Sequence, residues 1–249
     1  MKKKDEFIQR TYRTELASRE WASYEVRVKE TDLLIRSSSL EKERALNTVH
    51  SLRKGLEDYI HAHPRFRETL VPWPEDPFAP SLVKDMIMAG TIAGVGPMAA
   101  VAGAIAQRVG EMLLPRCSEV IVENGGDIYL KTERPVLVGI FAGTSLVSGK
   151  LAVRIQPAQT PLGICTSSAT VGPSKSFGKA DAVTILAKSA ALADALATSL
   201  ANQVKSPADI PAVLEKAKEF TGLSGIVIVV KDQLGAWGEI ELAPLGLEF

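Results

Sequence analysis

The chain is poor in the two residue types that most often build catalytic and metal sites. It has three histidines and two cysteines in 249 residues. The cysteines, Cys117 and Cys165, supply neither a disulfide framework nor a zinc cluster. The first residues, Met1–Glu6, lead into a polar stretch without the apolar core of a secretory signal. We therefore expect a reducing, cytoplasmic setting.

The three histidines also lie outside the segments that are candidates for a nucleophilic active site. His50, His61 and His63 all fall in the first expected helix or the loop after it, and none lies in the glycine-rich or Asp/Thr segments. Ser-His-Asp and Cys-His nucleophiles need a histidine beside them. The sequence gives such an enzyme little support.

An excess of charge is missing as well. Lys and Arg number 29 and Asp and Glu number 29, so the formal net charge is zero. Nucleic-acid binding draws on a basic excess, and we expect no such partner. The stretch Met86–Gln107 is uncharged and long enough to cross a bilayer. Because Ala, Gly and Pro97 dominate it, we expect two buried helices there and no membrane span.

The apolar periodicity predicts two similar halves, each with a hairpin, two helices and two strands. The first half has expected strands at 24–28 and 33–35, a helix from Leu40 to Ile60 capped by Ser39, a loop at 63–80, helices at 81–93 and 97–114, and strands at 120–122 and 128–130. The second has expected strands at 135–141, 150–156, 161–166 and 181–187, helices at 188–203 and 207–219, and strands at 225–231 and 237–242, with a turn at 232–235.

Sheets with helices on one face make an α+β protein. We predict one domain of two pseudo-repeat halves, about 20–131 and 132–245, after a polar arm at 1–19. The halves share no obvious sequence identity, so a duplication is an architectural hypothesis.

The run Ala193–Thr198 carries a carboxylate and a hydroxyl among small residues. Asp194 and Thr198 are four residues apart, so a helix places their oxygens on one face. This pair suits Mg²⁺, which takes few protein ligands and shares its remaining positions with water or phosphate. The alternative is that Asp194 only hydrogen-bonds within a tightly packed alanine helix, since two ligands specify little.

Two further segments are candidates for binding a ligand. Paired glycines between strands permit positive φ or close approach of a phosphate, although a common hairpin turn has the same pattern. A loop rich in hydroxyls and lysines follows Cys165 and is a plausible anion site, but it lacks the P-loop order. Cys165 itself fits a small buried residue better than a reactive thiol. The candidate residues are Asn124, Gly125, Gly126, Asp127, Thr166, Ser167, Ser168, Lys175 and Lys179.

The order of these segments resembles the ApbE-like flavin transferases. The resemblance rests on Asn124–Ile128, Thr166–Ser168, Ala180–Ala187 and Ala193–Thr198 and covers about 120–200. The hairpin around Glu30–Ile35 and the run from Pro97 to Ala106 resemble more closely an uncharacterised bacterial and archaeal branch of that superfamily, and this resemblance spans nearly the whole chain.

The resemblance implies a tandem of two T-fold-like units, with Asp194 and Thr198 as ligands of Mg²⁺. ApbE-like enzymes move FMN from FAD onto a protein threonine, so FAD or FMN is the implied cofactor. Those enzymes carry a His-x-x-Asp-Pro segment after the Thr-Ser motif. Here Val171–Lys179 has neither the histidine nor the Asp-Pro pair, which puts FMN transfer in doubt.

Two functions follow as expectations. The first is binding of a phosphorylated or nucleotide ligand, such as a flavin nucleotide, together with a divalent metal. Whether the protein is also an enzyme of the transferase type is left open. The alternative is a non-catalytic binding or assembly protein, which the branch's association with anaerobic sulfur (homocysteine) metabolism would suit. A stable flavin carrier is a narrower option. The expected partner is a small molecule, and self-association is left open.

Overall fold

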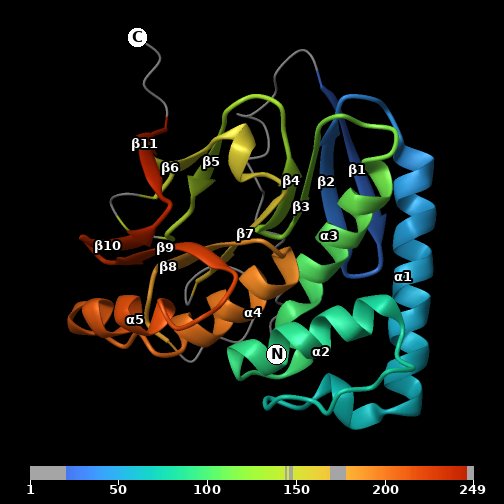
Figure 1. The fold of residues 1–249 in the computed structure, drawn as a ribbon, viewed down its shortest axis with the longest axis horizontal. Helices are drawn as coiled ribbons and strands as arrows, with labels where there is room; N and C mark the ends of the chain where they lie inside the picture. The colour runs from blue at the N-terminus through green and yellow to red at the C-terminus, as the bar shows by residue number, and fades with distance from the viewer. Residues whose placement is uncertain (1–20, 144, 146–147, 169–177, 246–249) are drawn as a thin grey trace, which may run out of the picture.

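The computed structural model describes residues 21–143, 145, 148–168 and 178–245. Its centre is an eight-stranded antiparallel sheet with the order β1-β2-β3-β4-β7-β8-β9-β10 (Figure 1). The strands are β1 (Ala22–Val28), β2 (Thr31–Ser37), β3 (Val120–Asn124), β4 (Asp127–Lys131), β7 (Leu162–Ser167), β8 (Ala182–Ala187), β9 (Leu223–Val230) and β10 (Gln233–Gly238).

The helices cover one face of this sheet. They are α1 (Lys42–Ala62), α2 (Ser81–Ala93), α3 (Val101–Leu113), α4 (Ala190–Ala201) and α5 (Ile210–Ala217), with 3-10 turns η2 (Pro64–Arg67), η3 (Pro97–Ala100), η4 (Pro157–Gln159) and η5 (Pro207–Asp209). α3 packs on β3 and β4, and α4 packs on β7 and β8. Leu33, Ile35, Val122 and Ile185 point from the strands into this larger core.

A smaller sheet covers part of the other face. It has the order β11-β6-β5, from β5 (Val136–Ile140), β6 (Leu151–Ile155) and β11 (Glu241–Pro244). Ile140, Val153 and Ile155 pack against Leu186 and Val227 of the main sheet. The main sheet is therefore apolar on both faces, as a sheet between two layers must be.

The predicted fold class is confirmed. Strands β1–β4 with α1–α3 and strands β7–β10 with α4 and α5 form two helix-backed, four-stranded halves of one antiparallel sheet. This is the α+β arrangement expected of two T-fold-like units. The boundaries of the pseudo-repeats stay a prediction, and the arm at 1–19 lies outside the described residues.

The structure corrects the start of the first helix. Ser39 does not cap α1, which begins at Lys42 after Glu41. The Ser39 hydroxyl instead donates to the Arg116 carbonyl at 3.3 Å. Leu40 is 68% exposed and lies outside the buried helix face. The chain stays extended here because the Ser38 N–H bonds to the Glu119 carbonyl at 3.1 Å.

Two hairpin turns also come earlier than expected. Lys29 (φ 53°) and Lys231 (φ 57°) adopt left-handed conformations at the turns. Consequently β2 begins at Thr31 and β10 begins at Gln233. The start of β10 has no apolar pattern that would reveal this, because β10 is largely exposed, and β2 begins with the polar residues Thr31 and Asp32.

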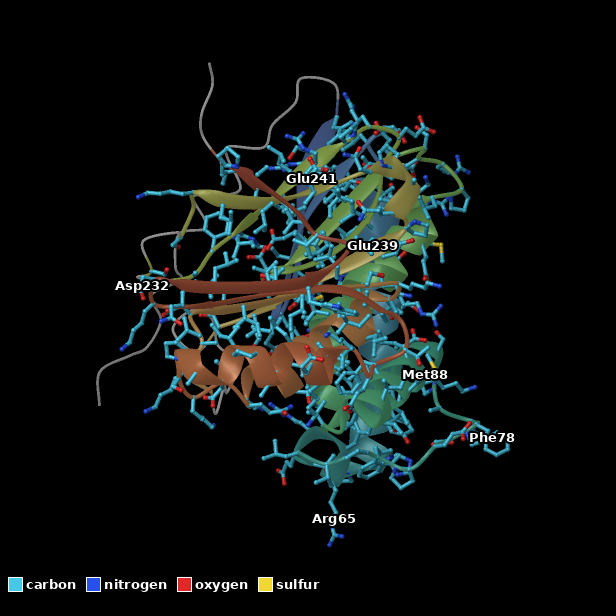
Figure 2. All side chains as sticks on the ribbon, turned by 60° about the vertical axis from the view of Figure 1, so that its left-hand side comes forward. Arg65, Phe78, Met88, Asp232, Glu239 and Glu241 are labelled. Atoms are coloured by element: carbon cyan, nitrogen blue, oxygen red, sulfur yellow. The ribbon has the colours of Figure 1, made fainter. Side chains whose placement is uncertain are left out.

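The uncharged stretch 86–107 forms parts of α2 and α3 with η3 between them. Among the described residues no single helix meets the length and apolarity of a membrane span, and the pair Ser81–Ala93 and Pro97–Leu113 meets them only together, bent by 105°. Met86 and Ala104 of this pair are fully buried in the core. A few apolar side chains nearby are exposed, and Figure 2 shows Phe78 and Met88 projecting outward on the α2 side.

Candidate ligand and cation site

The glycine pair forms the tight turn between β3 and β4. Gly125 has φ 70° and Gly126 has φ 108°, and Asn124 pairs with Asp127 across the turn. Such positive φ values favour glycine at both positions. A Cβ on Gly126 would meet no atom within 4 Å, so the turn needs glycine for its backbone angles and not for close packing. The backbone at Gly125–Gly126 is therefore an ordinary hairpin turn, as the alternative interpretation of the glycine pair expected.

Asp194 reaches across from α4 to the first turn of α3. Its Oδ2 accepts a hydrogen bond of 2.9 Å from the Gly103 N–H. The two helices touch here, since a Cβ on Gly103 would lie 2.2 Å from the Ala190 carbonyl oxygen. The Asn124 side chain donates to the Ala102 carbonyl at 3.1 Å. These contacts bring the β3–β4 turn, the start of α3 and the middle of α4 together.

Asp127 completes a pair of carboxyls at this place. It is the first residue of β4, and its register partner on β7 is Cys165. Burial raises the pKa of Asp127 to about 7, and the charge of Glu123 adds to the rise. Burial also raises the pKa of Asp194 well above its ordinary range, with the charge of Asp127 as the next cause. We call Asp127 and Asp194 the carboxylate pair.

Cys165 lies beside the carboxylate pair and is buried. Its thiol donates to the Ala190 carbonyl oxygen at 3.4 Å, and its register partner on β4 is Asp127. Burial, followed by the charges of Asp127 and Asp194, raises its pKa. A thiol held protonated is a poor nucleophile, which agrees with the small-buried-residue interpretation.

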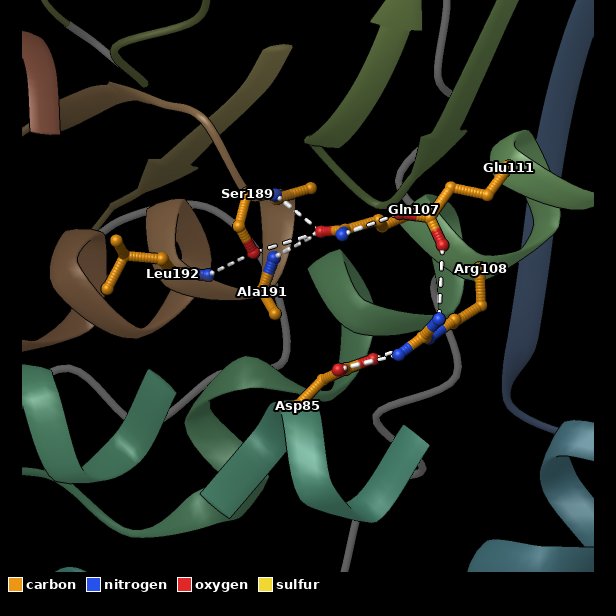
Figure 3. Close-up of polar contacts among 8 residues, drawn as sticks. Asp85, Gln107, Arg108, Glu111, Ser189, Ala191 and Leu192 are labelled. Atoms are coloured by element: carbon orange, nitrogen blue, oxygen red, sulfur yellow. Dashed lines mark hydrogen bonds and ion pairs between the residues drawn. The ribbon is translucent and has the colours of Figure 1, made fainter. Parts of the chain in front are cut away.

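Hydrogen bonds of the Gln107 side chain link α3 to the start of α4 (Figure 3). The Gln107 Oε1 accepts from the Ser189 hydroxyl at 3.0 Å and from the Ala190 N–H at 2.9 Å. Its Nε2 donates to Glu111 at 2.8 Å. Gln107 thus satisfies amides at the start of α4, while Asp194 satisfies an amide at the start of α3. The two helices are therefore joined by two sets of hydrogen bonds, one helical turn apart on each helix.

The predicted site residues divide between the two faces of the main sheet. Thr198 lies one turn after Asp194 on α4 and is half-buried. Thr166 and Ser168 line the opposite face, where the Thr166 hydroxyl lies 2.9 Å from that of Thr184. Ser167, between them on β7, pairs with Val183 of β8.

Of the two candidate lysines, only Lys179 lies in the described part of the chain, and it does not join the carboxylate pair. Lys179 is exposed, and its backbone N–H donates to the Val204 carbonyl at 2.8 Å, beyond the end of α4. Lys175 lies outside the described residues. A phosphate-neutralising role for either lysine stays a prediction.

A pocket that the sequence did not reveal lies between the main sheet and β5. It has a volume of about 420 Å³. Its lining includes Leu34, Ile121, Ile128, Leu130 and Ile164 from the main sheet, 136–139 of β5 with the flanking Pro135 and Phe141, and the Gly125–Gly126 turn at one end. The sequence pattern that could have indicated this pocket is the apolar character of these strand positions on the face opposite the helices.

The donor atoms at the carboxylate pair suit a hard cation. Asp194 and Thr198 offer a carboxylate and a hydroxyl on one helix face, and Asp127 adds a second acidic group nearby. Mg²⁺ takes one or two carboxylates and completes its shell with water and phosphate oxygens. No group of three or more His, Cys, Asp or Glu side chains suited to a metal occurs in the part of the chain that the structure describes. The residues therefore fit a cation shared with a ligand and do not fit a closed structural metal site.

Comparison with known proteins assigns the family. A family model described as AbpE bacteria matches residues 13–234. The chain is 41% identical over 228 residues to a UPF0280 protein of Methanocaldococcus jannaschii, covering 88% of this chain and 92% of that relative. It is 45% identical over 201 residues to a UPF0280 protein of Methanosphaerula palustris, covering 80% and 82%. The chain belongs to this ApbE-like family, in the branch that includes the UPF0280 proteins.

Solved structures show the same fold at low sequence identity. The flavin transferase ApbE from Vibrio cholerae aligns with a TM-score of 0.59 at 14% identity, over 91% of this chain and 97% of that one. The apbe protein from Thermotoga maritima aligns with a TM-score of 0.57 at 12% identity, over 88% and 97%. The resemblance to the ApbE-like superfamily is thereby confirmed at the level of the fold.

Proposed function

We propose that this protein binds a phosphorylated nucleotide, a flavin nucleotide foremost, together with a divalent cation at the carboxylate pair. The proposal rests on the burial of two interacting carboxyl groups, those of Asp127 and Asp194, away from solvent. Two buried carboxyls with raised pKa values are costly to ionise together, and a cation between or beside them offsets that cost.

Each residue has a role in the proposal. Asp194 and Thr198 hold the cation, and Asp127 adds negative charge on its other side. The Asn124 side chain, anchored on Ala102, keeps the glycine turn against the start of α3, where the ligand's phosphate would lie. When bound, the cation would neutralise phosphate oxygens and polarise a phosphoryl group. The chain's own groups bind and orient, and no protein nucleophile is required.

The choice of flavin rests on the shared fold. The solved neighbours whose names specify flavin transferases cover nearly this whole chain. A transferase-like role is a natural extension of that likeness. The proposal stops at binding, because Val171–Lys179 lacks the His-x-x-Asp-Pro segment of the transferases. Cytoplasmic residence belongs to the same proposal and suits a nucleotide ligand.

Thermal unfolding tests the proposal directly. Melting temperature is measured with FAD, FMN and ATP, each with Mg²⁺ and with EDTA, for the wild type, Asp194→Asn and the exposed control Asp58→Asn. A ligand at 100 times its Kd stabilises the native state by about 2.7 kcal/mol. We expect a Mg²⁺-dependent rise with a flavin nucleotide that Asp194→Asn abolishes and Asp58→Asn keeps. No rise with any nucleotide would refute it.

One observation favours the alternative of a binding or assembly protein that kept the fold without ligand chemistry. The Asp194–Gly103 hydrogen bond gives Asp194 a structural task at the start of α3. Under this alternative, Asp194→Asn keeps the acceptor and complements a deletion strain fully. Under the proposed function, the same variant folds but fails to complement.

A further inference from the structure

The outermost strands of the main sheet, β1 and β10, differ in charge (Figure 1). An edge strand presents backbone N–H and C=O groups that another strand can join, and charged side chains or proline usually prevent this. β1 carries such protection, because Arg27 forms ion pairs with Glu25 at 2.9 Å and with Asp32 at 3.2 Å. The edge at β1 is therefore poorly suited to pairing with another strand.

The edge at β10 has none of this protection. β10 reads Gln-Leu-Gly-Ala-Trp-Gly and contains neither a charged residue nor a proline. Every second residue of an edge strand directs its backbone N–H and C=O away from the neighbouring strand. Within the described ranges 21–143, 145, 148–168 and 178–245, the backbone groups of 233–237 pair with β9 alone. The outer backbone groups of β10 therefore suit a further β-strand.

Apolar side chains on one face of β10 are exposed beside this edge. Gly235 faces α5, since an added Cβ would lie 2.3 Å from the Ile210 Cγ2. Because side chains alternate along a strand, Leu234 and Ala236 lie on the opposite face. Leu234 is 40% exposed, and Ala236 is exposed as well. A strand paired with β10 would cover both side chains.

The edge of β10 is complementary to a second copy of itself. In antiparallel pairing, residues directly opposite each other must both direct their backbone groups toward the partner or both direct them away. Two identical strands meet this condition only when a two-fold axis passes through a residue. An axis at Gly235 opposes residues 233–237 of the two copies, and an axis at Ala236 opposes residues 234–238.

The charges that flank β10 select between these two registers. Lys231 and Glu239 are exposed, and Figure 2 shows Glu239 at one end of β10 and Asp232, the neighbour of Lys231, at the other. With the axis at Gly235, Lys231 lies opposite Glu239 of the second copy, and the symmetry gives this pair twice. With the axis at Ala236, Glu239 would oppose the uncharged Gln233. Charge complementarity therefore favours the axis at Gly235.

We propose that this protein forms a two-fold symmetric dimer through β10, in which the two main sheets join into one antiparallel sheet with Gly235 at the axis. Backbone hydrogen bonds between the two strands supply the attraction, and the two pairs of Lys231 with Glu239 set the register. This interface goes beyond the proposed function, since neither nucleotide nor cation takes part in it. A single strand pair is a small interface, so the affinity is micromolar and not nanomolar.

Sedimentation equilibrium with charge-reversal variants tests the dimer and its register. Protein is measured without nucleotide from about 1 to about 300 µM, as the wild type, Lys231→Glu, Glu239→Lys and the variant that carries both changes. Lys29→Glu is the matched control. Lys29 occupies the equivalent left-handed turn position, with φ 53° against 57° for Lys231, at the opposite edge of the sheet.

The wild type should reach twice the mass of one chain within this range. Each single reversal places two pairs of like charges in the interface and should weaken association at least about fivefold. The double variant should restore the wild-type affinity, and Lys29→Glu should leave it unchanged. A wild type that stays monomeric at the highest concentration would overturn the proposal. Single reversals that match the wild type, or a double variant that is not restored, would overturn it as well.

Disulfide trapping tests the register by geometry instead of charge. Leu234→Cys/Ala236→Cys places cysteines opposite each other in the two copies, at a Cα separation of about 4.5–5.5 Å that a disulfide can bridge. Gln233→Cys/Ala236→Cys is the control, because position 233 then lies opposite Trp237. The two native cysteines are buried. Mild oxidation should give a covalent dimer of the first variant only, and a covalent dimer of both variants or of neither would overturn the proposal.

Discussion

The Asp194 carboxylate and the Gly103 N–H, 91 residues apart in the chain, form a 2.9 Å hydrogen bond between α4 and the start of α3. This bond places a charged acceptor at a helix N-terminus, where the helix dipole favours negative charge. Burial and Asp127 oppose that charge, and the pKa of Asp194 is raised. The same residue thus joins two helices and supplies a carboxylate that a cation would stabilise.

The two functions of the Asp194 side chain can be separated by substitution. Asp194→Asn keeps a hydrogen-bond acceptor for the Gly103 N–H, whereas Asp194→Ala leaves that N–H without its partner. We expect Asp194→Ala to unfold at lower urea concentration, with a free energy of unfolding about 1–3 kcal/mol below that of Asp194→Asn. Equal stability of the two variants would show that the bond contributes nothing.

The pKa of Asp127 makes the stability of the metal-free protein depend on pH. Its folded-state pKa is about 7, against an ordinary value of 3.8. The native state therefore holds a proton that the unfolded chain releases, so stability is present below pH 4 and falls as pH rises from about 4 to about 7. Asp127→Asn should flatten this slope in urea titrations with EDTA present. An unchanged slope in the variant would argue against a buried, proton-binding Asp127.

Close packing at Gly103 should make even a methyl group harmful. A Cβ there would lie 2.2 Å from the Ala190 carbonyl oxygen and 2.9 Å from the Asp194 Cβ. We expect Gly103→Ala to cost about 1–3 kcal/mol of unfolding free energy, since α3 and α4 must separate. Gly55 of α1 is the matched control, because its added Cβ would come no closer than 3.6 Å to any atom, at Pro80. Gly55→Ala should stabilise by about 0.5–1 kcal/mol, and the opposite ranking in thermal unfolding would contradict the packing described.

Gln107→Ala should lower the free energy of unfolding, because the Gln107 side chain links α3 to the start of α4. Gln107→Ala removes the acceptor for the Ser189 hydroxyl and the Ala190 N–H at the start of α4. Ser189 remains the N-cap of α4, because its Oγ still accepts from the Leu192 N–H at 3.3 Å. The expected cost is therefore that of leaving two donors without their acceptor, about 1–3 kcal/mol. Thr48→Ala on α1 removes only an exposed hydroxyl bonded to Arg44 of its own helix and should change little. Similar unfolding midpoints for the two variants would show that the hydrogen bonds of Gln107 to the start of α4 do not stabilise the protein.

Most of the fold was predictable because apolar residues recur with the period of a strand or a helix within its elements. The alternation in β1, the uncharged α2–α3 stretch and the glycine turn all led to the correct elements. The start of α1 was not predictable, since Ser39 and Leu40 have the pattern of a cap and an apolar face. A tertiary hydrogen bond from the Ser38 N–H to Glu119 decides their conformation instead.

The candidate site was predictable only in part. Spacing alone placed Asp194 and Thr198 on one helix face, and the turn residues Asn124 and Asp127 were identified as candidates. The contact of Asp194 with Gly103 could not be predicted, because it depends on how α3 crosses α4. The pocket was missed because residues on the second face of the sheet become a site only when β5 covers them.

The most direct test of the central claim is isothermal titration of FAD into the wild-type protein, once with Mg²⁺ and once with EDTA. We expect one binding site per chain with Mg²⁺, with affinity at least about tenfold weaker in EDTA and in Asp194→Asn. Binding of equal affinity with Mg²⁺, with EDTA and in Asp194→Asn would contradict a cation-assisted site at the carboxylate pair.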